Sequence, residues 1–498
     1  MRRRTLLLAA LLTATAGLLF APGMTGVVFN SDEAFLATEG QVLEAGGRLY
    51  HDVVDRKPPV VPLLYAGVRR LTGTGELWPM RLVGIAARSV TAMLLAYEAR
   101  RRWSSRAGIW AGFLFLASAA ALPPSDAQAA NFEIFMLPTM VAALTLGARG
   151  FAGSSGAMLA ISTLTKQTAA VGLLPLAVLA WRCQPRSGLV RLALGFTFPI
   201  VATASWFGAD AFLFWNYLGT GDYLDVGGVL GFALRQGAER TAMFLLANAA
   251  IVAPVVAGRR AWRQDLDLWL WLATAAIGVA TGLRFFEHYY LQLIPILCLL
   301  AARPLDELTP RLAAATGAVV AATALFFQGA AFAYASGKDE EQLETVGAYV
   351  QAQTVPEARV LVWGHWPELY WHTDRLPATR FLTTGFLTGH SGGRPPDRVG
   401  TEYATDGAWE MFEADLEANP PALVIVPTEL RSAPHYRPGL FPRFADWLDA
   451  NYRLVARMED VEVYSTRVDQ PATAIGAGAS STVSVGTSSA FFVAYVSM

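Results

Sequence analysis

Runs of apolar residues long enough to cross a bilayer recur along most of this chain, and they restrict its possible folds more than any other feature. A membrane-spanning helix needs roughly 20 mostly apolar residues. We predict about eleven spans, or about ten to thirteen, because two short runs meet at Thr165-Lys166-Gln167 and can form one bent unit. The spans lie near residues 5–21, 79–98, 107–122, 131–148, 152–165, 168–181, 190–208, 241–257, 267–283, 289–302 and 311–333. The predicted fold class is therefore a polytopic α-helical membrane protein.

The composition supports a bilayer as the solvent for most of the chain. Of the 498 residues, 54% are hydrophobic and only 16% are charged, and the mean hydropathy is +0.36. The chain thus carries more apolar surface than a soluble core buries. The net charge of −1 argues against a nucleic-acid partner, which would need a basic face. The two cysteines are too few for a disulfide framework.

The arginines indicate the orientation of the spans, because cytoplasmic loops of membrane proteins hold an excess of Lys and Arg. When Arg2-Arg3-Arg4 is placed inside, every second loop is basic and falls on the same side. These loops contain Arg100-Arg101-Arg102 with Arg106, Arg182 with Arg186, Arg259-Arg260 with Arg263, and Arg303 with Arg311. We therefore expect a multi-pass protein of the cytoplasmic membrane, with its N-terminus in the cytoplasm and the residues after 334 outside it.

A water-soluble pattern replaces the apolar runs near the end of the chain. It predicts helices near 341–353, 407–418 and 441–451, and strands at 359–363, at 422–427 and as a pair around 453–465. The chain thus divides into a transmembrane module (residues 1–335), an extracytoplasmic α/β domain (residues 336–467) and a flexible tail rich in Ala, Gly, Ser and Thr (residues 468–498).

Two acids follow the first span, in the sequence Asn30-Ser31-Asp32-Glu33. An amphipathic helix is predicted from there to Gly46-Gly47, lying on the bilayer surface with Ser31 as its N-cap. The acids are either stabilised by the helix dipole, which is worth under about 1 kcal/mol, or functional, because charges held at the membrane plane are costly. Neighbours on a helix point about 100° apart, so only one of the two can face a given cavity.

The first outer loop ends with Tyr50 and, a few residues later, Lys57-Pro58-Pro59. The prolines end any helix, and Pro58 favours an extended backbone at Lys57, so that the ammonium group projects at the interface. This ammonium group can bind an anionic group of a substrate, or it can simply reach lipid phosphates, as lysines of membrane proteins often do.

These segments, in this order, resemble the GT-C membrane glycosyltransferases. The resemblance rests on Asp32-Glu33, on the stretch from Tyr50 to Lys57-Pro58-Pro59, and on Arg284-Phe285-Phe286-Glu287-His288-Tyr289-Tyr290 at the entry to a later span. It covers roughly residues 1–335, and the most similar branch contains the protein O-mannosyltransferases and the lipid A aminoarabinose transferase. It implies a hexosyl- or pentosyltransferase that takes its sugar from a polyprenyl-phosphate carrier at the outer face of the membrane.

The resemblance also implies roles for residues at matching positions. Asp32, with Glu33 beside it, matches an aspartate near the reacting centre, and Lys57 matches a lysine that contacts the carrier phosphate. Arg56 stands where the aminoarabinose transferase has an acid before its lysine, so a metal or acceptor role of that acid does not transfer. Glu133 matches a second acid, which opens the fourth span in the family.

The chemistry of sugar transfer explains these residue types. A carboxylate must orient or deprotonate the acceptor hydroxyl, while cations stabilise the phosphate that leaves the anomeric carbon. Arg284 is the best second cation, because a guanidinium can hold phosphate with two parallel hydrogen bonds; alternatively, it fixes a helix end. The further candidates are Asp126, in reserve for Glu133, and Tyr50, His288 and Tyr289.

No cofactor is assigned, although a divalent metal is compatible with the outer acids and histidines. His288 with Glu287, and His51 with Asp52, could supply ligands. The six histidines are scattered without compact ligand spacing, which favours hydrogen bonding instead. Lys166 lies between two apolar runs, and a short surface turn is favoured there over a buried functional cation.

A transporter or flippase of lipid-linked sugars is the alternative function. Such a protein should show paired halves with broken helices, and no such repeat is evident, nor is a Walker-type nucleotide-binding loop. A membrane anchor for a binding domain would leave the loop acids and Lys57 without a role. We therefore predict a glycosyltransferase that binds a polyprenyl-phosphate sugar, a lipid, glycan or protein acceptor, and membrane lipids.

Overall fold

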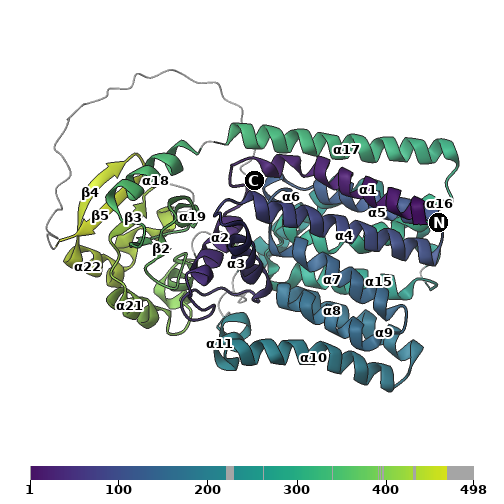
Figure 1. Cartoon of the computed structure of the whole chain (residues 1–498), viewed down its shortest axis with the longest axis horizontal. Coiled ribbons are helices and arrows are strands. Elements are labelled where there is room, and N and C mark those ends of the chain that lie inside the picture. Colours follow the sequence, from purple (N-terminus) through teal and green to yellow (C-terminus); the bar gives the residue numbers. More distant parts are fainter. Residues whose placement is uncertain are drawn as a thin grey trace.

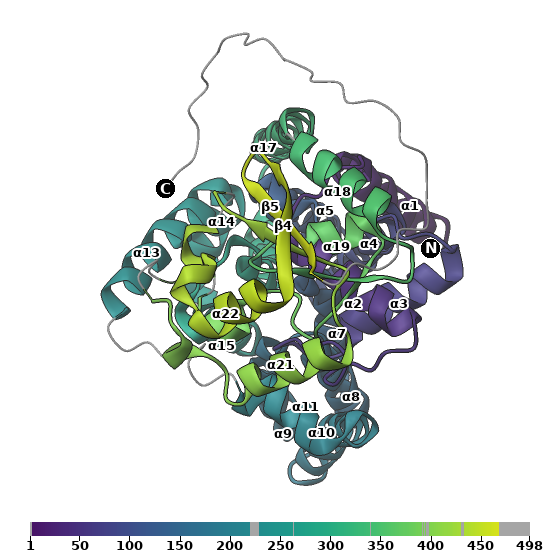
Figure 2. The same ribbon diagram turned by 90° about the vertical axis from the view of Figure 1, so that its left-hand side faces the viewer.

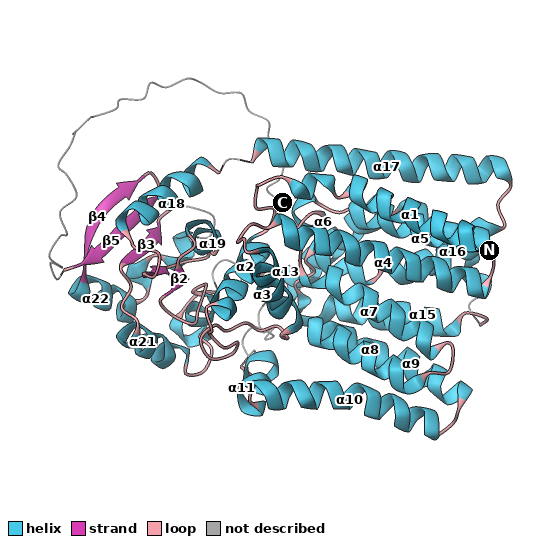
Figure 3. Ribbon diagram, in the orientation of Figure 1, coloured by secondary structure: helices cyan, strands magenta, loops and turns pink. Residues whose placement is uncertain are grey.

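The computed structural model describes residues 2–219, 229–261, 263–338, 340–390, 392, 394, 398–429 and 433–467. The predicted tail at 468–498 lies outside these residues. A bundle of long helices fills one part of the molecule, and a small α/β domain covers one end of it (Figure 1). Strands occur only in that domain among the described residues (Figure 3).

The bundle is built from apolar helices, most of which overlap one predicted span each. They are α1 (Arg2–Leu19), α4 (Trp78–Arg102), α5 (Ser105–Ala120), α7 (Phe132–Gly147), α8 (Ala152–Thr165), α9 (Leu173–Cys183), α10 (Ser187–Phe207), α13 (Leu230–Ala247), α14 (Ala249–Gly258), α15 (Leu266–Ala280), α16 (Ile294–Asp306) and α17 (Pro310–Gly337).

Four helical stretches of the described chain are long and apolar enough to cross a membrane unaided: Trp78–Arg102, Ser187–Phe207, Leu266–Leu283 and Pro310–Gly337. The predicted span at 241–257 falls on α13 and α14, which are bent by 89° and would count as a fifth if taken together. The other helices are shorter, so the total of eleven spans remains a prediction.

Apolar side chains cover the outside of the bundle as well as its inside. On α10, Phe198 is 75% exposed, and on α17, Phe326 is 70% exposed. Both helices lie at the periphery (Figure 2), where lipid tails rather than water suit such side chains. Inside, helices approach closely at small residues: a Cβ on Gly195 would lie 2.0 Å from the Gly153 carbonyl oxygen, so α8 and α10 pack backbone to backbone.

The basic loops gather at the end of the bundle opposite the α/β domain. Arg102 pairs with Asp267 at 2.5 Å and Arg303 with Asp265 at 2.8 Å, which ties three of these loops together. The N-terminus lies at this end too (Figure 1). The structure thus separates the arginine-rich loops from the α/β domain, as the predicted orientation requires.

Two further helices, α2 (Ser31–Glu44) and α3 (Val60–Thr72), form the first outer loop. α2 packs against α3 and against α19 (Glu368–Thr373) of the α/β domain, and most of its residues are buried. Protein therefore covers polar as well as apolar residues of α2, which its amphipathic pattern did not predict, and its place on the bilayer surface stays a prediction. The predicted N-cap is wrong. Asn30 caps α2 by accepting a hydrogen bond from the Asp32 amide at 2.9 Å, while the Ser31 hydroxyl donates to Glu368 at 2.8 Å.

The α/β domain contains a five-stranded sheet in the order β2-β1-β3-β5-β4. β1 pairs in parallel with β2 and β3, while β5 pairs antiparallel with β3 and β4. Its elements are α18 (Glu341–Gln353), β1 (Arg359–Val362), α19, β2 (Leu376–Pro377), α20 (Gly385–Thr388), α21 (Ala408–Ala418), β3 (Leu423–Pro427), α22 (Pro442–Asn451), β4 (Tyr452–Met458) and β5 (Val461–Thr466). The sequence predicted these elements except β2, α19 and α20, which are too short to show a period.

The remaining described elements are single turns and short helices. They are η1 (Ala21–Met24), α6 (Pro124–Ala127), η2 (Gln167–Gly172), α11 (Ala209–Leu213), η3 (Phe214–Leu218), η4 (Arg259–Ala261), η5 (Thr281–Leu283), η6 (Glu287–Gln292), η7 (Thr401–Tyr403), η8 (Ala433–Tyr436) and η9 (Pro438–Leu440).

Candidate active site

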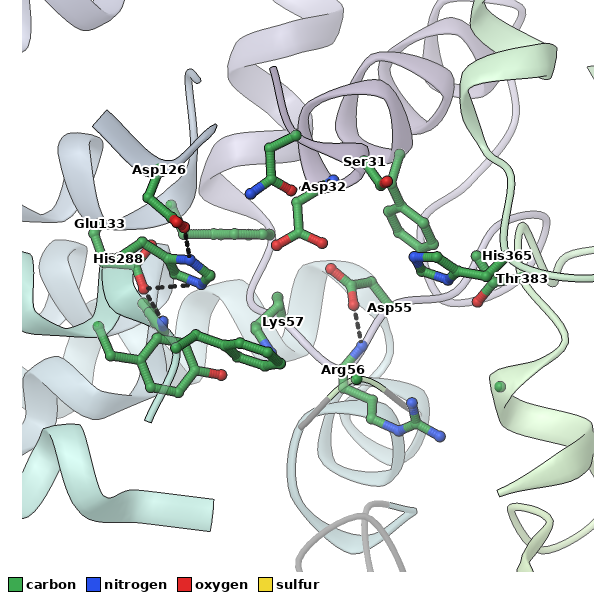
Figure 4. Close-up of a pocket in the computed structure, with 18 of the residues that line it drawn as sticks. Ser31, Asp32, Asp55, Arg56, Lys57, Asp126, Glu133, His288, His365 and Thr383 are labelled. Carbon is green, nitrogen blue, oxygen red and sulfur yellow. Dashed lines mark hydrogen bonds and ion pairs between the residues drawn. The ribbon is translucent and has the colours of Figure 1, made fainter. Parts of the chain in front are cut away.

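A cavity of about 490 Å³ lies where the helical bundle, the first outer loop and the α/β domain meet. We name its three sides by their origin. The first-loop wall comprises Asp32, Asp55, Arg56 and Lys57; the helix wall comprises Asp126, Glu133, Lys166, His288 and Tyr289; the domain wall comprises His365, Thr383, His390 and Tyr436. Figure 4 shows most of these side chains directed toward the same space.

The first-loop wall brings two carboxylates together. Asp32 is exposed in the first turn of α2, and its carboxylate points toward that of Asp55 on the same wall (Figure 4). Asp55 accepts a hydrogen bond from the Arg56 amide at 2.6 Å. Burial raises the pKa of Asp55, the Lys57 ammonium opposes that rise, and the Asp32 charge adds to it. Asp55 was not predicted from the sequence, because the resemblance concerns the residue directly before Lys57.

Lys57 is held in place by its own loop. The Tyr50 hydroxyl donates to the Lys57 carbonyl oxygen at 2.9 Å, and the Tyr50 ring packs edge-on against Phe207 and Phe212. α3 begins directly after the two prolines that follow Lys57. Tyr50 is therefore not part of the cavity lining, but it fixes the backbone from which Lys57 reaches the cavity.

Glu33 lies on the other side of α2, fully buried. Its two carboxylate oxygens accept hydrogen bonds from Arg81 at 2.8 and 2.7 Å, and one of them also accepts from the Ala130 amide at 3.1 Å. Arg81 in turn donates to three carbonyl groups of the preceding loop. The structure thus directs Asp32 to the cavity and leaves Glu33 outside it, where Glu33 ties the first outer loop to α4.

The helix wall is a chain of mutually paired charges. The His288 Nδ1 lies 2.5 Å from an Asp126 oxygen, and its Nε2 lies 3.9 Å from a Glu133 oxygen. The same Glu133 oxygen forms an ion pair with Lys166, whose ammonium lies 3.7 Å from the centre of the Tyr289 ring. Lys166 is only 4% exposed, so the predicted surface turn is wrong: the break between α8 and η2 carries a buried cation.

Arg284, the predicted second cation, does not line the cavity. It is 1% exposed and donates to the Gly392 carbonyl oxygen at 2.5 Å. Arg240 lines the cavity instead. Its guanidinium pairs with Glu287 at 3.2 Å and donates to the carbonyl groups of Arg284 and Phe285. Arg240 belongs to α13, far from the motif in sequence, and carried no local signal.

Thr383, His390 and Tyr436 of the domain wall were not predicted from the sequence. His365 follows β1, Thr383 and His390 follow β2, and Tyr436 follows β3. The only available signal was the placement of polar residues just after apolar strands. Three of the six histidines, which looked scattered along the chain, thus line one cavity.

The candidate metal ligands do not converge. Among the described residues, no three His, Cys, Asp or Glu side chains are placed to hold a metal ion. His288 is engaged by Asp126. His51 and Asp52 line a second cavity, of about 320 Å³, between the end of α2 and the α/β domain.

Comparisons with known proteins support the fold. The family model for dolichyl-phosphate-mannose-protein mannosyltransferase matches residues 56–206, which is less than half of the chain. No curated protein matches the chain in sequence. Among solved structures, ArnT from Cupriavidus metallidurans, bound to undecaprenyl phosphate, is similar with a TM-score of 0.61 and 16% identity, over 92% of this chain and 97% of that one. The archaeal oligosaccharyltransferase AglB from Archaeoglobus fulgidus, in complex with an inhibitory peptide and a dolichol-phosphate, has a TM-score of 0.51 and 11% identity, over 95% and 75%.

The chain therefore has the helical membrane fold of the GT-C glycosyltransferases, and the resemblance inferred from its sequence is confirmed. The family model and the ArnT structure agree with the branch that the sequence resembles, while AglB is an oligosaccharyltransferase.

Proposed function

We propose that this protein is a membrane glycosyltransferase that moves a sugar from a polyprenyl-phosphate donor to a hydroxyl group of a lipid, glycan or protein acceptor. The observation that carries the proposal is the pair of carboxylates, Asp32 and Asp55, which face one another beside Lys57 in a cavity at the edge of the helical bundle. Titratable groups of opposite charge converging in one cavity are what such a transfer requires.

The proposed reaction uses these groups in opposite roles. The acceptor oxygen forms a bond to the anomeric carbon while the bond from that carbon to the phosphate oxygen breaks. Asp32 takes the proton of the acceptor hydroxyl, and the polyprenyl phosphate leaves with the bonding electrons. Lys57 stabilises the charge of that phosphate, and Asp55 orients the acceptor from beside Asp32.

The cations around the leaving phosphate differ from those that the sequence suggested. Arg240 is the proposed helper of Lys57, because it lines the cavity whereas Arg284 does not. Arg284 keeps an indirect role, since its carbonyl group accepts a hydrogen bond from Arg240 at 3.3 Å.

We propose that the cavity lies at the outer face of the cytoplasmic membrane, because the arginine-rich loops gather at the other end of the bundle. Single cysteines at Ser31 and Ser336, in a background with Cys183 replaced by Ser, should react with an impermeant thiol reagent on intact cells, while a cysteine at Ser105 should not. Ser336 and Ser105 are both exposed. Labelling at Ser105 alone would reverse the orientation.

The direct test is an assay of the purified protein with a panel of polyprenyl-phosphate hexoses and pentoses. Mass spectrometry should show loss of one donor and appearance of the free polyprenyl phosphate together with a glycosylated product. Movement of intact lipid-linked sugar across a vesicle membrane, without cleavage of the sugar–phosphate bond, would instead support a flippase.

A further inference from the structure

The parallel strands of the α/β domain all point their carboxyl ends at the cavity. The chain leaves β1 toward His365, leaves β2 toward Thr383 and His390, and leaves β3 toward Tyr436. The strand order β2-β1-β3 reverses at β1, because the chain runs from β1 to β2 on one side of it and then crosses to β3 on the other side. In open parallel sheets, ligands bind beyond the carboxyl ends of the strands at such a reversal of strand order. The domain therefore directs its natural ligand-binding edge at the site.

Hydrogen bonds join the three connections into one surface. The Thr384 amide donates to the Gly364 carbonyl oxygen at 3.0 Å, which links the segments after β1 and β2. The Trp363 indole donates to the Tyr436 carbonyl oxygen at 2.5 Å, which links the segments after β1 and β3. This edge is thus a defined wall rather than a set of independent loops.

Two histidines belong to this wall, and a third, His435, packs against one of them. The rings of His390 and His435 stack with centres 4.7 Å apart, and His365 lines the cavity beside them. His390 is 7% exposed, and its Nδ1 has no hydrogen-bond partner among the described residues. Burial, followed by His435, His365 and Arg284, lowers the pKa of His390 to about 4. The imidazole is therefore neutral at physiological pH, and one of its nitrogens has no hydrogen-bond partner among the described residues.

The charge of this wall differs from that of the others. The described lining residues of the α/β domain include no carboxylate, whereas the other two walls bring Asp32, Asp55, Asp126, Glu133 and Glu287. An anion would be repelled by those carboxylates unless a cation such as Lys57 neutralised them. On the domain wall it would meet imidazole and hydroxyl donors.

We propose that the domain wall is a second oxyanion subsite, which binds a phosphate or carboxylate group of the acceptor through His390 and His365. This inference rests on the proposed function, because it assigns the wall opposite the donor phosphate to the second substrate. With this subsite, the expected acceptors are molecules that carry an acidic group near the hydroxyl that is glycosylated.

The probe is inorganic phosphate, titrated by calorimetry into the purified full-length protein in the presence of saturating undecaprenyl phosphate. We expect phosphate to bind under these conditions and to bind at least about tenfold more weakly to His390→Asn, as for loss of a hydrogen bond to a charged group. His51→Asn is the matched control, because His51 lies in the other cavity, and its phosphate affinity should equal that of the wild type.

Undecaprenyl phosphate should bind His390→Asn as tightly as wild type, which shows that the variant is folded. Equal phosphate affinity in His390→Asn and wild type would overturn the subsite, and so would complete displacement of phosphate by undecaprenyl phosphate, which would assign the ion to Lys57. Failure of undecaprenyl phosphate to bind the wild type would count against the proposed function instead. The phosphate affinities of wild type and His390→Asn would then be compared in the absence of undecaprenyl phosphate.

Discussion

The first-loop wall and the helix wall of the cavity are both rich in charge, but they arrange it differently. On the helix wall, the charged side chains form a series of pairs: Asp126 with His288, His288 with Glu133, and Glu133 with Lys166. On the first-loop wall, Asp32 forms no ion pair with any described residue, and its carboxylate faces Asp55, a group of the same sign.

This difference separates charges that maintain the shape of the cavity from charges that can act on a substrate. A buried ion pair is costly to break, because removing one partner leaves the other charge without compensation. A carboxylate that faces open space and another carboxylate gains most when a substrate arrives. We therefore assign the chemistry to the first-loop wall and the support to the helix wall.

The largest effect is expected from Asp32→Asn, which keeps the shape of the side chain and removes its charge. If Asp32 accepts the acceptor proton, turnover should fall by roughly 10²–10⁴-fold, the usual range for loss of a general base. Donor binding and the melting temperature should stay nearly unchanged, because Asp32 is exposed. The rate is measured by mass spectrometry with the donor identified from the panel.

Glu33→Gln is the matched control for this change, because it removes the charge of the neighbouring acid, which lies outside the cavity. The change also breaks the ion pair between Glu33 and Arg81. It should lower the melting temperature while folded molecules keep most of their turnover. Near-normal turnover in Asp32→Asn combined with a folded but inactive Glu33→Gln protein would contradict the assignment.

The next largest effect is expected from Lys166→Met, which should lower the stability of the folded protein. Loss of the cation leaves Glu133 buried without its partner, which costs about 3–5 kcal/mol in comparable pairs. Thermal unfolding in detergent should show the loss, and Lys166→Met with Glu133→Gln should recover part of it. An unchanged melting temperature together with weakened donor binding would move Lys166 from support to substrate binding.

Lys57→Ala should weaken donor use by at least about 1.5 kcal/mol, the lower end for a hydrogen bond to a charged group. Lys57→Arg should restore it only in part, because a planar guanidinium does not replace a compact ammonium. The measurement is the KM for the donor in the wild type and in each Lys57 variant. Lys338→Ala, which removes a lysine outside the cavity, should leave the KM unchanged; equal effects of the two alanine variants would reduce Lys57 to a contact with ordinary lipid.

The smallest effect is expected behind the first-loop wall, at Glu39. This residue lies two turns after Asp32 on α2, is fully buried, and neither of its carboxylate oxygens has a hydrogen-bond partner among the described residues. Burial, and then the charge of Asp55, raise the pKa of Glu39 well above its ordinary value. Between its pKa in the unfolded chain and that higher value, the folded protein holds a proton that the unfolded chain has lost, so stability falls as the pH rises.

Glu39→Gln should remove this part of the pH dependence. The melting temperature of the wild type should fall more between pH 5 and pH 8 than that of the variant, with the two closest at the acidic end. Glu344→Gln, at an exposed position on α18, should follow the wild type. Parallel curves for Glu39→Gln and wild type would mean that Glu39 titrates normally.

The local part of the fold could be predicted from the sequence, because apolar runs and strand alternation are properties of neighbouring residues. The bundle helices and the strand at Leu423–Pro427 follow this rule. The position of α2 could not be predicted, because its amphipathic pattern suits a membrane surface and a protein interface equally well. Only tertiary packing decides that α19 covers it.

The candidate site divides in the same way. Asp32 and Lys57 carried local signals, a helix start and a lysine before proline, and the structure places both in the cavity. The partner of Lys166 is Glu133, more than thirty residues away, and His390 meets His365 only through the strand order of a sheet. Single-residue signals cannot carry such distant pairings, and for the same reason Arg284 was favoured over Arg240.

The cavity joins residues from early and late in the chain: one wall begins at Asp32 and another begins at His365. Roughly 330 residues separate them, and at about 5–20 residues per second a ribosome needs on the order of a quarter of a minute to a minute to make that stretch. Throughout this interval the nascent protein holds the proposed general base and phosphate ligand without the surface that closes them in. A polypeptide released early, by a premature stop or by proteolysis near α17, would insert into the membrane yet lack the wall that completes the cavity.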